Sequence, residues 1–144
     1  YGGDPIVPTA ICLDLYTPYA HYHTHPQHLH GDASNLHWFT DECLDYIYSS
    51  HVLEDFIDTE EVLREWSRVL KPGGNLVLFL PDEQAYRAYC AVNGNEPNRH
   101  HIHQEFSLNY LKEIVGLIGG LEVIHELYPV AEYSFELILK KLKV

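Results

Sequence analysis

The sequence has no methionine and only three cysteines. Both features limit the classes of protein to which it can belong. Cys12, Cys43 and Cys90 are odd in number, widely spaced and without a CxxC pair, which excludes a disulfide-stapled scaffold, a zinc ribbon and a thioredoxin-like site. Cys12 and Cys43 lie in apolar runs, so we expect buried, reduced thiols and a cytoplasmic protein. The absence of methionine even at position 1 indicates a fragment or a chain trimmed at its amino terminus.

Positive charge is also scarce. Lys and Arg total 9 against 21 Asp and Glu, which gives a formal net charge of -12. Such an acidic surface repels phosphate backbones and anionic lipid headgroups, so neither nucleic acid nor a membrane is expected as a partner. No apolar run approaches the ~18 residues of a membrane span, and no signal peptide is visible.

The sequence does contain enough apolar material for a folded domain. Of its 144 residues, 46% are hydrophobic and 12% are aromatic, a composition typical of globular proteins. A chain of this length builds a single core. We therefore predict one domain over residues 1–144.

The clearest structural signal lies between residues 44 and 82. The apolar run 44–48 predicts a buried strand, and residues 60–70 repeat apolar side chains at the spacing of one helix face. Asp58 followed by Glu61 is typical of a helix N-terminus. The turn 71–74 (Lys-Pro-Gly-Gly) then leads into a β run over 75–80, so this segment predicts a strand–helix–strand unit of a parallel sheet.

Weaker signals extend this pattern on both sides. Short strands are expected at 9–15 and 28–30, with a loop over 16–27 between them. Strands that alternate with helices predict an α/β fold with a parallel sheet, closed by an antiparallel strand pair. After residue 81 the expected order is a short helix, a polar loop, an amphipathic helix and two strands, at 82–92, 93–99, 107–118, 121–130 and 134–142.

Three stretches resemble class I S-adenosylmethionine-dependent methyltransferases of the type 11-like group: LDYIYSSHVLEDF (44–56), EVLREWSRVLKPGGNLVLFLPD (61–82) and Gly31-Asp32-Ala33. The resemblance implies a Rossmann-like, mostly parallel sheet with helices on both faces. It also implies that the last strand is inserted antiparallel between two parallel neighbours. The implied activity is transfer of the S-adenosylmethionine methyl group to an O, N or C nucleophile of a small-molecule acceptor.

Asp14 ends the predicted strand 9–15, where a carboxylate can accept both hydrogen bonds of a ribose diol. The resemblance implies that Leu15 packs on the adenine and that Asp32 accepts a hydrogen bond from its amino group. It further implies that the glycines hold the methionine end of the cofactor. The predicted cofactor-binding residues are Gly2, Gly3, Asp14, Leu15, Asp32, Ala33, Ser49 and Ser50.

The acceptor side is expected at the same edge of the sheet. His51 follows the strand 44–48 and is the candidate catalytic residue, although a histidine at the start of a helix or loop more often has a capping or packing role. A second histidine group follows the strand 75–80, where family members place acceptor-lining residues. The candidate substrate residues are Tyr86, Tyr89, His101 and His103.

The glycine-rich loop departs from the family pattern. In the family, G-x-G-x-G precedes a full helix and then the ribose-binding acid, whereas here ten residues separate Gly3 from Asp14. Ten residues cannot hold a helix and a strand. Either a proline-containing loop replaces the helix, or the first strand and its glycine lie upstream of Tyr1.

Histidine is unusually frequent, with 11 in the chain, and five of them fall in HYHTHPQHLH (21–30). Alternate spacing in an extended loop could present imidazoles to zinc or nickel. No nearby cysteine or glutamate completes a ligand set, so a His-rich surface loop is favoured and no metal site is predicted.

Two alternatives to a methyltransferase stay open at this point. One is a non-catalytic methyltransferase-like domain with a binding or assembly role, and the other is a metal-binding protein that uses the His-rich loop. An NAD-linked enzyme is a weaker third alternative because GxGxxG is absent. The sequence leaves the oligomeric state open, a homo-oligomer included.

Overall fold

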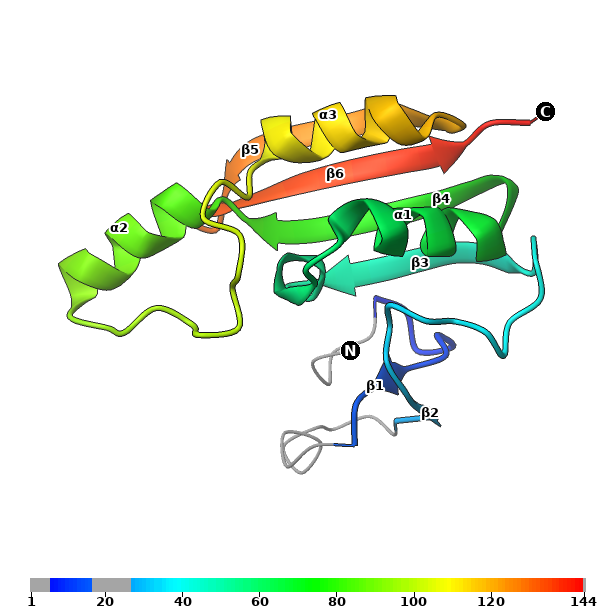
Figure 1. The fold of residues 1–144 in the computed structure, drawn as a ribbon, viewed down its shortest axis with the longest axis horizontal. Coiled ribbons are helices and arrows are strands. Elements are labelled where there is room, and N and C mark those ends of the chain that lie inside the picture. Colours follow the sequence, from blue (N-terminus) through cyan, green and yellow to red (C-terminus); the bar gives the residue numbers. More distant parts are fainter. Residues whose placement is uncertain (1–5, 17–26, 144) are drawn as a thin grey trace.

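The computed structural model describes residues 6–16 and 27–143, which form two groups of strands with helices packed on the larger group (Figure 1). The smaller group is a parallel pair, β1 (Leu13–Asp14) and β2 (Leu29–His30). The larger sheet contains β3 (Leu44–Ser50), β4 (Leu70–Pro81), β5 (Leu121–Val130) and β6 (Ser134–Lys141). The helices are the short 3₁₀ helix η2 (Leu53–Asp55), α1 (Thr59–Val69), α2 (Glu83–Asn93) and α3 (Leu108–Ile118).

The strand order of the larger sheet is β3-β4-β6-β5. β4 runs parallel to β3, whereas β6 runs antiparallel to both of its neighbours, β4 and β5. Val77 of β4 is thereby paired with Tyr48 on one side and Ile138 on the other. The expected mixed sheet, with an antiparallel strand inserted between two parallel ones, is confirmed.

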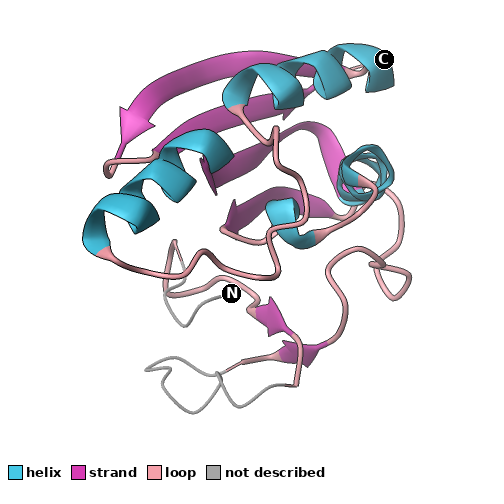
Figure 2. Ribbon diagram, turned by 60° about the vertical axis from the view of Figure 1, so that its left-hand side comes forward, coloured by secondary structure: helices cyan, strands magenta, loops and turns pink. Residues whose placement is uncertain are grey.

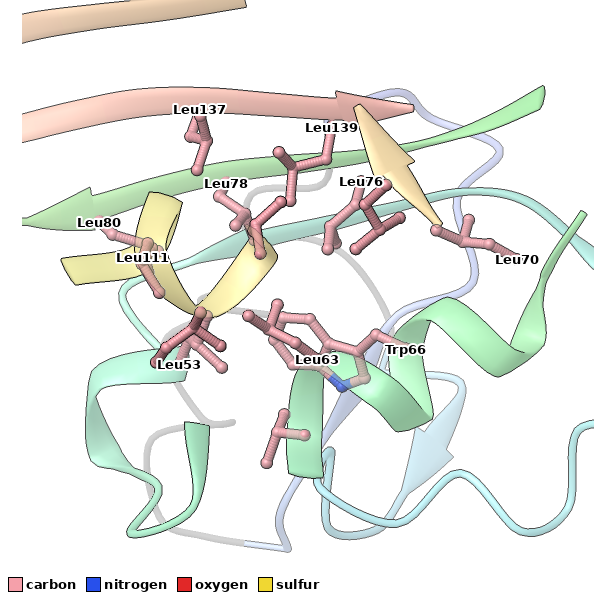
Figure 3. Close-up of a cluster of buried hydrophobic side chains, with 14 of the residues drawn as sticks. Leu53, Leu63, Trp66, Leu70, Leu76, Leu78, Leu80, Leu111, Leu137 and Leu139 are labelled. Atoms are coloured by element: carbon pink, nitrogen blue, oxygen red, sulfur yellow. The ribbon is translucent and has the colours of Figure 1, made fainter. Parts of the chain in front are cut away.

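The core forms where β4 and β6 meet α1 and α3 (Figure 3). Leu76, Leu78 and Leu80 alternate along β4 with partly exposed residues, and each is at most 1% exposed. Trp66 and Leu63 of α1 close over them from the helix side. Full burial of each leucine stabilises the fold by about 1.5–3 kcal/mol, so this layer fixes α1 against the sheet.

The start of α1 follows its sequence signal closely. The Asp58 side chain accepts a hydrogen bond from the Glu61 backbone N–H at 2.9 Å, as an N-cap residue does. The other helices are also near their expected positions, and Ser107 and Asp82 cap α3 and α2 in the same way. In the described part of the chain, none of the helices has the length and apolar character needed to cross a membrane.

The helices are arranged differently from the expectation. Figures 1 and 2 show α1 and α3 on the same face of the larger sheet, while α2 extends beyond the carboxyl end of β4. Helices on both faces are not seen among the described residues, because those that precede β3 form no α-helix. On the opposite face Tyr46 is consequently exposed, and Val77 and Phe79 are only partly buried.

Two predicted boundaries need correction. α1 ends at Val69, before the predicted turn, and Leu70 already pairs with Leu44 in the sheet. The turn 71–74 is instead an irregularity between that pair and the next, where a Cβ on Gly74 would lie 2.9 Å from two backbone carbonyl oxygens. The predicted strand 9–15 shrinks to Leu13–Asp14, since its partner β2 offers only two residues for pairing.

Candidate functional site

The carboxyl ends of β1 and β2 bring the first group of predicted residues together. The Gly31 N–H donates to the Asp14 carbonyl oxygen at 3.0 Å, which sets Asp14 beside the segment that carries Asp32. The Asp14 carboxylate accepts from the Leu15 N–H at 2.7 Å, and Leu15 itself is 53% exposed. Asp32 accepts from the Ser34 N–H and hydroxyl at 2.8 and 2.7 Å, which shapes a turn.

A groove continues from this turn toward the segment that follows β3. It has a volume of about 890 Å³, and its lining includes Ser34 and Asn35 on one side and Phe56 and Ile57 on the other. Ala33 is held beside it, because its carbonyl oxygen accepts a 2.7 Å hydrogen bond from the indole N–H of Trp66. The rest of its lining comes largely from the outer side of α1, including Glu61, Arg64 and Arg68. Gly2 and Gly3, and most of the His-rich loop, lie outside the described residues.

Ser49, Ser50 and His51 lie where β3 ends. Ser49 is 6% exposed, and its hydroxyl has no hydrogen-bond partner within the described part of the chain. Ser50 pairs with Phe79, so it faces the opposite side of the sheet from Ser49. His51 has a φ of 50°, and its backbone N–H donates to the Phe79 carbonyl oxygen at 2.9 Å. This left-handed turn ends the strand.

The His51 ring faces two residues that the sequence analysis did not connect with it. Its Nδ1 lies 3.5 Å from Glu54 Oε1, and its Nε2 lies 3.5 Å from the Ser134 hydroxyl oxygen. The ring centroid is also 6.3 Å from that of Tyr133. His51 is therefore part of a polar and aromatic cluster built from the segment after β3, the first residue of β6 and the turn before β6.

Three of the residues predicted for the acceptor side, Tyr86, Tyr89 and His101, lie close together around Tyr133. The centroid of the Tyr86 ring lies 4.8 Å from that of His101 and 5.1 Å from that of Tyr133. The ring centroids of Tyr89 and Tyr133 are also 5.1 Å apart. Burial raises the pKa of Tyr86, and the nearby Glu132 carboxylate raises the pKa of Tyr89. Both phenols stay protonated at neutral pH and can donate hydrogen bonds.

His103 makes a separate set of contacts. Its Nε2 lies 2.6 Å from the Phe56 carbonyl oxygen and 3.4 Å from the Thr59 hydroxyl. These contacts hold the loop before α3 against the start of α1. Its predicted place in the acceptor wall therefore has no support from these contacts.

Comparison with known proteins places this arrangement in a family. Residues 9–78 match the sequence pattern of a family described as a methyltransferase domain. Over these residues, just under half of the chain, the sequence is similar to the class I S-adenosylmethionine-dependent methyltransferases of the type 11 group. No curated protein matches it in sequence.

Solved structures share the methyltransferase fold. A Haloferax volcanii protein assigned as a methyltransferase, in complex with the Trm112 methyltransferase activator, is 17% identical with a TM-score of 0.62, over 91% of this chain and 71% of that one. A Bacillus halodurans protein with the same assignment is 17% identical with a TM-score of 0.62, over 86% and 75%. A SAM-dependent methyltransferase from Aquifex aeolicus is 16% identical with a TM-score of 0.63, over 90% and 67%. At these identities the likeness establishes the fold.

The methyl donor of this family is S-adenosylmethionine, and the described residues fit its nucleoside end. Asp14 and Asp32 stand at the ends of neighbouring parallel strands, where open α/β sheets bind nucleotides. The unpaired Ser49 hydroxyl supplies a buried polar group at the end of β3. A buried hydroxyl without a partner is costly, so a polar ligand group here would remove that cost.

A buried acidic cluster next to His51 was missed by sequence reasoning. Glu54 and Glu83 are 1% and 0% exposed, and His101 lies between them. Burial, followed by the Glu54 charge, raises the pKa of the neighbouring Asp55. The only sequence signal was an acidic pair inside the apolar segment Val52–Phe56, which is more often a solvent-exposed turn.

Proposed function

We propose that this methyltransferase domain binds S-adenosylmethionine across the carboxyl ends of β1, β2 and β3 and transfers its methyl group to a small-molecule acceptor. The cofactor supplies a methyl group that is already activated for nucleophilic attack. The work left to the protein is to align the acceptor with that group. The acceptor atom would be O, N or C.

The observation that carries this proposal is the placement of Asp14 and Asp32. Both carboxylates lie where parallel strands end, and the segment that follows Asp32 lines the groove through Ser34 and Asn35. Two strand-end carboxylates suit a ribose diol and an adenine amino group, each of which donates hydrogen bonds. The family match over residues 9–78 includes both positions.

His51 is the proposed base for an acceptor that loses a proton during transfer. Its ring lies at the end of β3 beside Glu54 and Tyr133. A histidine with a nearby carboxylate can accept a proton near neutral pH. Tyr86, Tyr89 and Tyr133 would form the wall against which the acceptor packs.

We also propose that residues 1–144 form a single domain in the cytoplasm. α1 connects its two groups of strands, because Trp66 packs in the core of the larger sheet and donates to Ala33, which follows β2. The thiols of Cys12, Cys43 and Cys90 are free, which suits a reducing compartment.

The test is a calorimetric titration of the purified chain with S-adenosylhomocysteine. We expect saturable binding, weakened roughly tenfold or more by Asp14→Asn, since a hydrogen bond to a charged group contributes about 1.5–3 kcal/mol. Asp45→Asn is the matched control, because Asp45 lies at the amino end of β3 with its side chain 79% exposed and bound to Lys71.

A folded chain that fails to bind would contradict the cofactor proposal. It would favour the non-catalytic binding or assembly domain, which the shortened glycine loop and the absence of a helix in residues 6–12 also suit. Equal binding by Asp14→Asn and the parent chain would show that the ribose contact is placed elsewhere.

A further inference from the structure

We propose that Glu54, Asp55 and His101 bind a divalent transition-metal ion such as Mn²⁺ or Zn²⁺. Ligand atoms of these three side chains all lie within 4.8 Å of one another. Glu54 and Asp55 come from η2, and His101 comes from the loop between α2 and α3. The site adjoins the proposed acceptor wall, but the proposal does not depend on methyl transfer.

The first supporting observation is the state of Glu54. Its side chain is 1% exposed, yet neither carboxylate oxygen has a hydrogen-bond partner among the residues that the structure describes. The nearest basic atoms are His51 Nδ1 at 3.5 Å and His101 Nε2 at 3.6 Å from Oε1. A buried carboxylate without hydrogen bonds costs several kcal/mol unless a cation or a proton compensates it. Glu54 is therefore a buried carboxylate directed into the cluster, with two imidazoles at ion-pair distance but with no hydrogen bond from the described residues.

The second observation is the way His101 is held. Its Nδ1 lies 2.8 Å from Glu83 Oε2, and Glu83 is completely buried. A carboxylate in this position fixes the ring so that Nδ1 carries the proton and the Nε2 lone pair points away from it. In this structure Nε2 points toward Glu54. Carboxylate support of this kind is what metal-binding histidines ordinarily have.

The charge balance points in the same direction. Glu54, Asp55 and Glu83 carry three negative charges when ionised, and Arg87 supplies one positive charge, with its Nε 2.7 Å from Glu83 Oε1. If His101 is neutral, two negative charges remain. A divalent cation supplies the matching charge.

The distances and the donor types suit a first-row metal. A cation about 2.1 Å from two ligand atoms sets them roughly 3.0–3.4 Å apart, and the Glu54–His101 pair is separated by 3.6 Å. Two carboxylates with one imidazole suit Mn²⁺ or Zn²⁺ better than a site made of carboxylates alone. Asp55 is on the exposed side of the cluster, which gives the ion a path in.

The test is titration of the purified, untagged chain with MnCl₂, followed by the loss of the free-ion electron paramagnetic resonance signal, and in parallel with ZnCl₂ by calorimetry. We expect saturable binding of one ion and a metal-dependent rise in Tm. Asp55→Asn should weaken binding by about tenfold or more, and because Asp55 is exposed, this variant should still fold. Glu60→Gln is the control, since Glu60 is bound only to Arg64 on the outside of α1.

Further variants separate a metal ligand from a structural residue. Glu54→Gln should also weaken binding, and the nitrogen coupling in the pulsed Mn²⁺ spectrum should disappear in His101→Gln. No saturable binding by the folded chain at millimolar metal would overturn the proposal. Binding that survives Glu54→Gln and Asp55→Asn, but is lost when His23 and His25 are replaced, would overturn it as well and place the ion in the His-rich loop.

Discussion

Trp66 packs in the core and also donates a hydrogen bond to a distant segment of the chain. Its ring is 2% exposed in the core, and its indole N–H donates to the Ala33 carbonyl oxygen at 2.7 Å. The first role follows from the apolar spacing of α1. The second connects α1 to the segment after β2, which carries one wall of the groove.

The substitution Trp66→Phe should lower the free energy of unfolding by about 1–3 kcal/mol, because the Ala33 carbonyl oxygen loses its donor. Urea unfolding followed by circular dichroism measures the change. Trp38→Phe is the matched control and should cost less, since Trp38 is 40% exposed. An equal loss in both variants would mean that ring size, and not the hydrogen bond, sets the effect.

At the residue scale the sequence predicts positions better than partners. Asp14, Asp32, Ser49 and His51 follow apolar runs, so their places at strand ends could be inferred locally. Glu54 and Tyr133 could not be found this way. Their burial depends on chain segments that are distant in sequence, such as the contact of Glu54 with His101.

At the element scale, α1 fixes the position of the segment that forms one side of the groove. Glu65 accepts from the Leu36 N–H at 2.9 Å and from Arg68 at 2.8 Å, and Arg68 also binds the carbonyl oxygens of Leu36 and Phe39. The segment after β2 is thereby fixed along the side of the helix. One face of α1 is buried in the core, and an adjacent edge holds this loop.

These contacts make stability depend on pH. The Arg68 hydrogen bond holds the pKa of Glu65 below its ordinary value of 4.5. A lowered pKa in the folded state stabilises the protein above pH ~4.5, and that contribution is lost as the pH falls through the folded-state value. The stability difference between the parent chain and Glu65→Gln should therefore be larger at about pH 6 than at about pH 3.

Chemical denaturation at the two pH values measures this difference. Glu113→Gln is the control for removing a carboxylate, because Glu113 is exposed on α3. A difference for Glu65→Gln that does not change with pH would show that the ion pair contributes nothing to folding.

Most elements were predictable because their signals are periodic and local. α1, α2 and α3 and the strands β3, β5 and β6 begin and end close to the expected residues, whereas β4 begins at Leu70 and not at the expected residue 75. The short β1 and the single helix-covered face were not predictable. Both depend on which other segments pair or pack with them, and the apolar pattern of a single segment does not specify this.

The whole molecule carries a charge that is unusually sensitive to pH. Its formal net charge is -12 with all 11 histidines neutral, and full protonation of them would bring it to about -1. Repulsion between copies should therefore decrease as the pH falls through about 6.5. Light scattering at several pH values should show self-association or lower solubility below that point, and an unchanged scattering signal would contradict the expectation.

The insertion of β6 between β4 and β5 also determines when this sheet can be completed during synthesis. Every other described element leaves the ribosome before β6, yet β6 is a central strand of the sheet. Until it is made, one edge of β4 lacks its partner, and the leucines at 76, 78 and 80 lack part of their cover. An unpaired apolar edge is a template for pairing with other chains, so the nascent methyltransferase domain is most prone to aggregation just before its last strand appears.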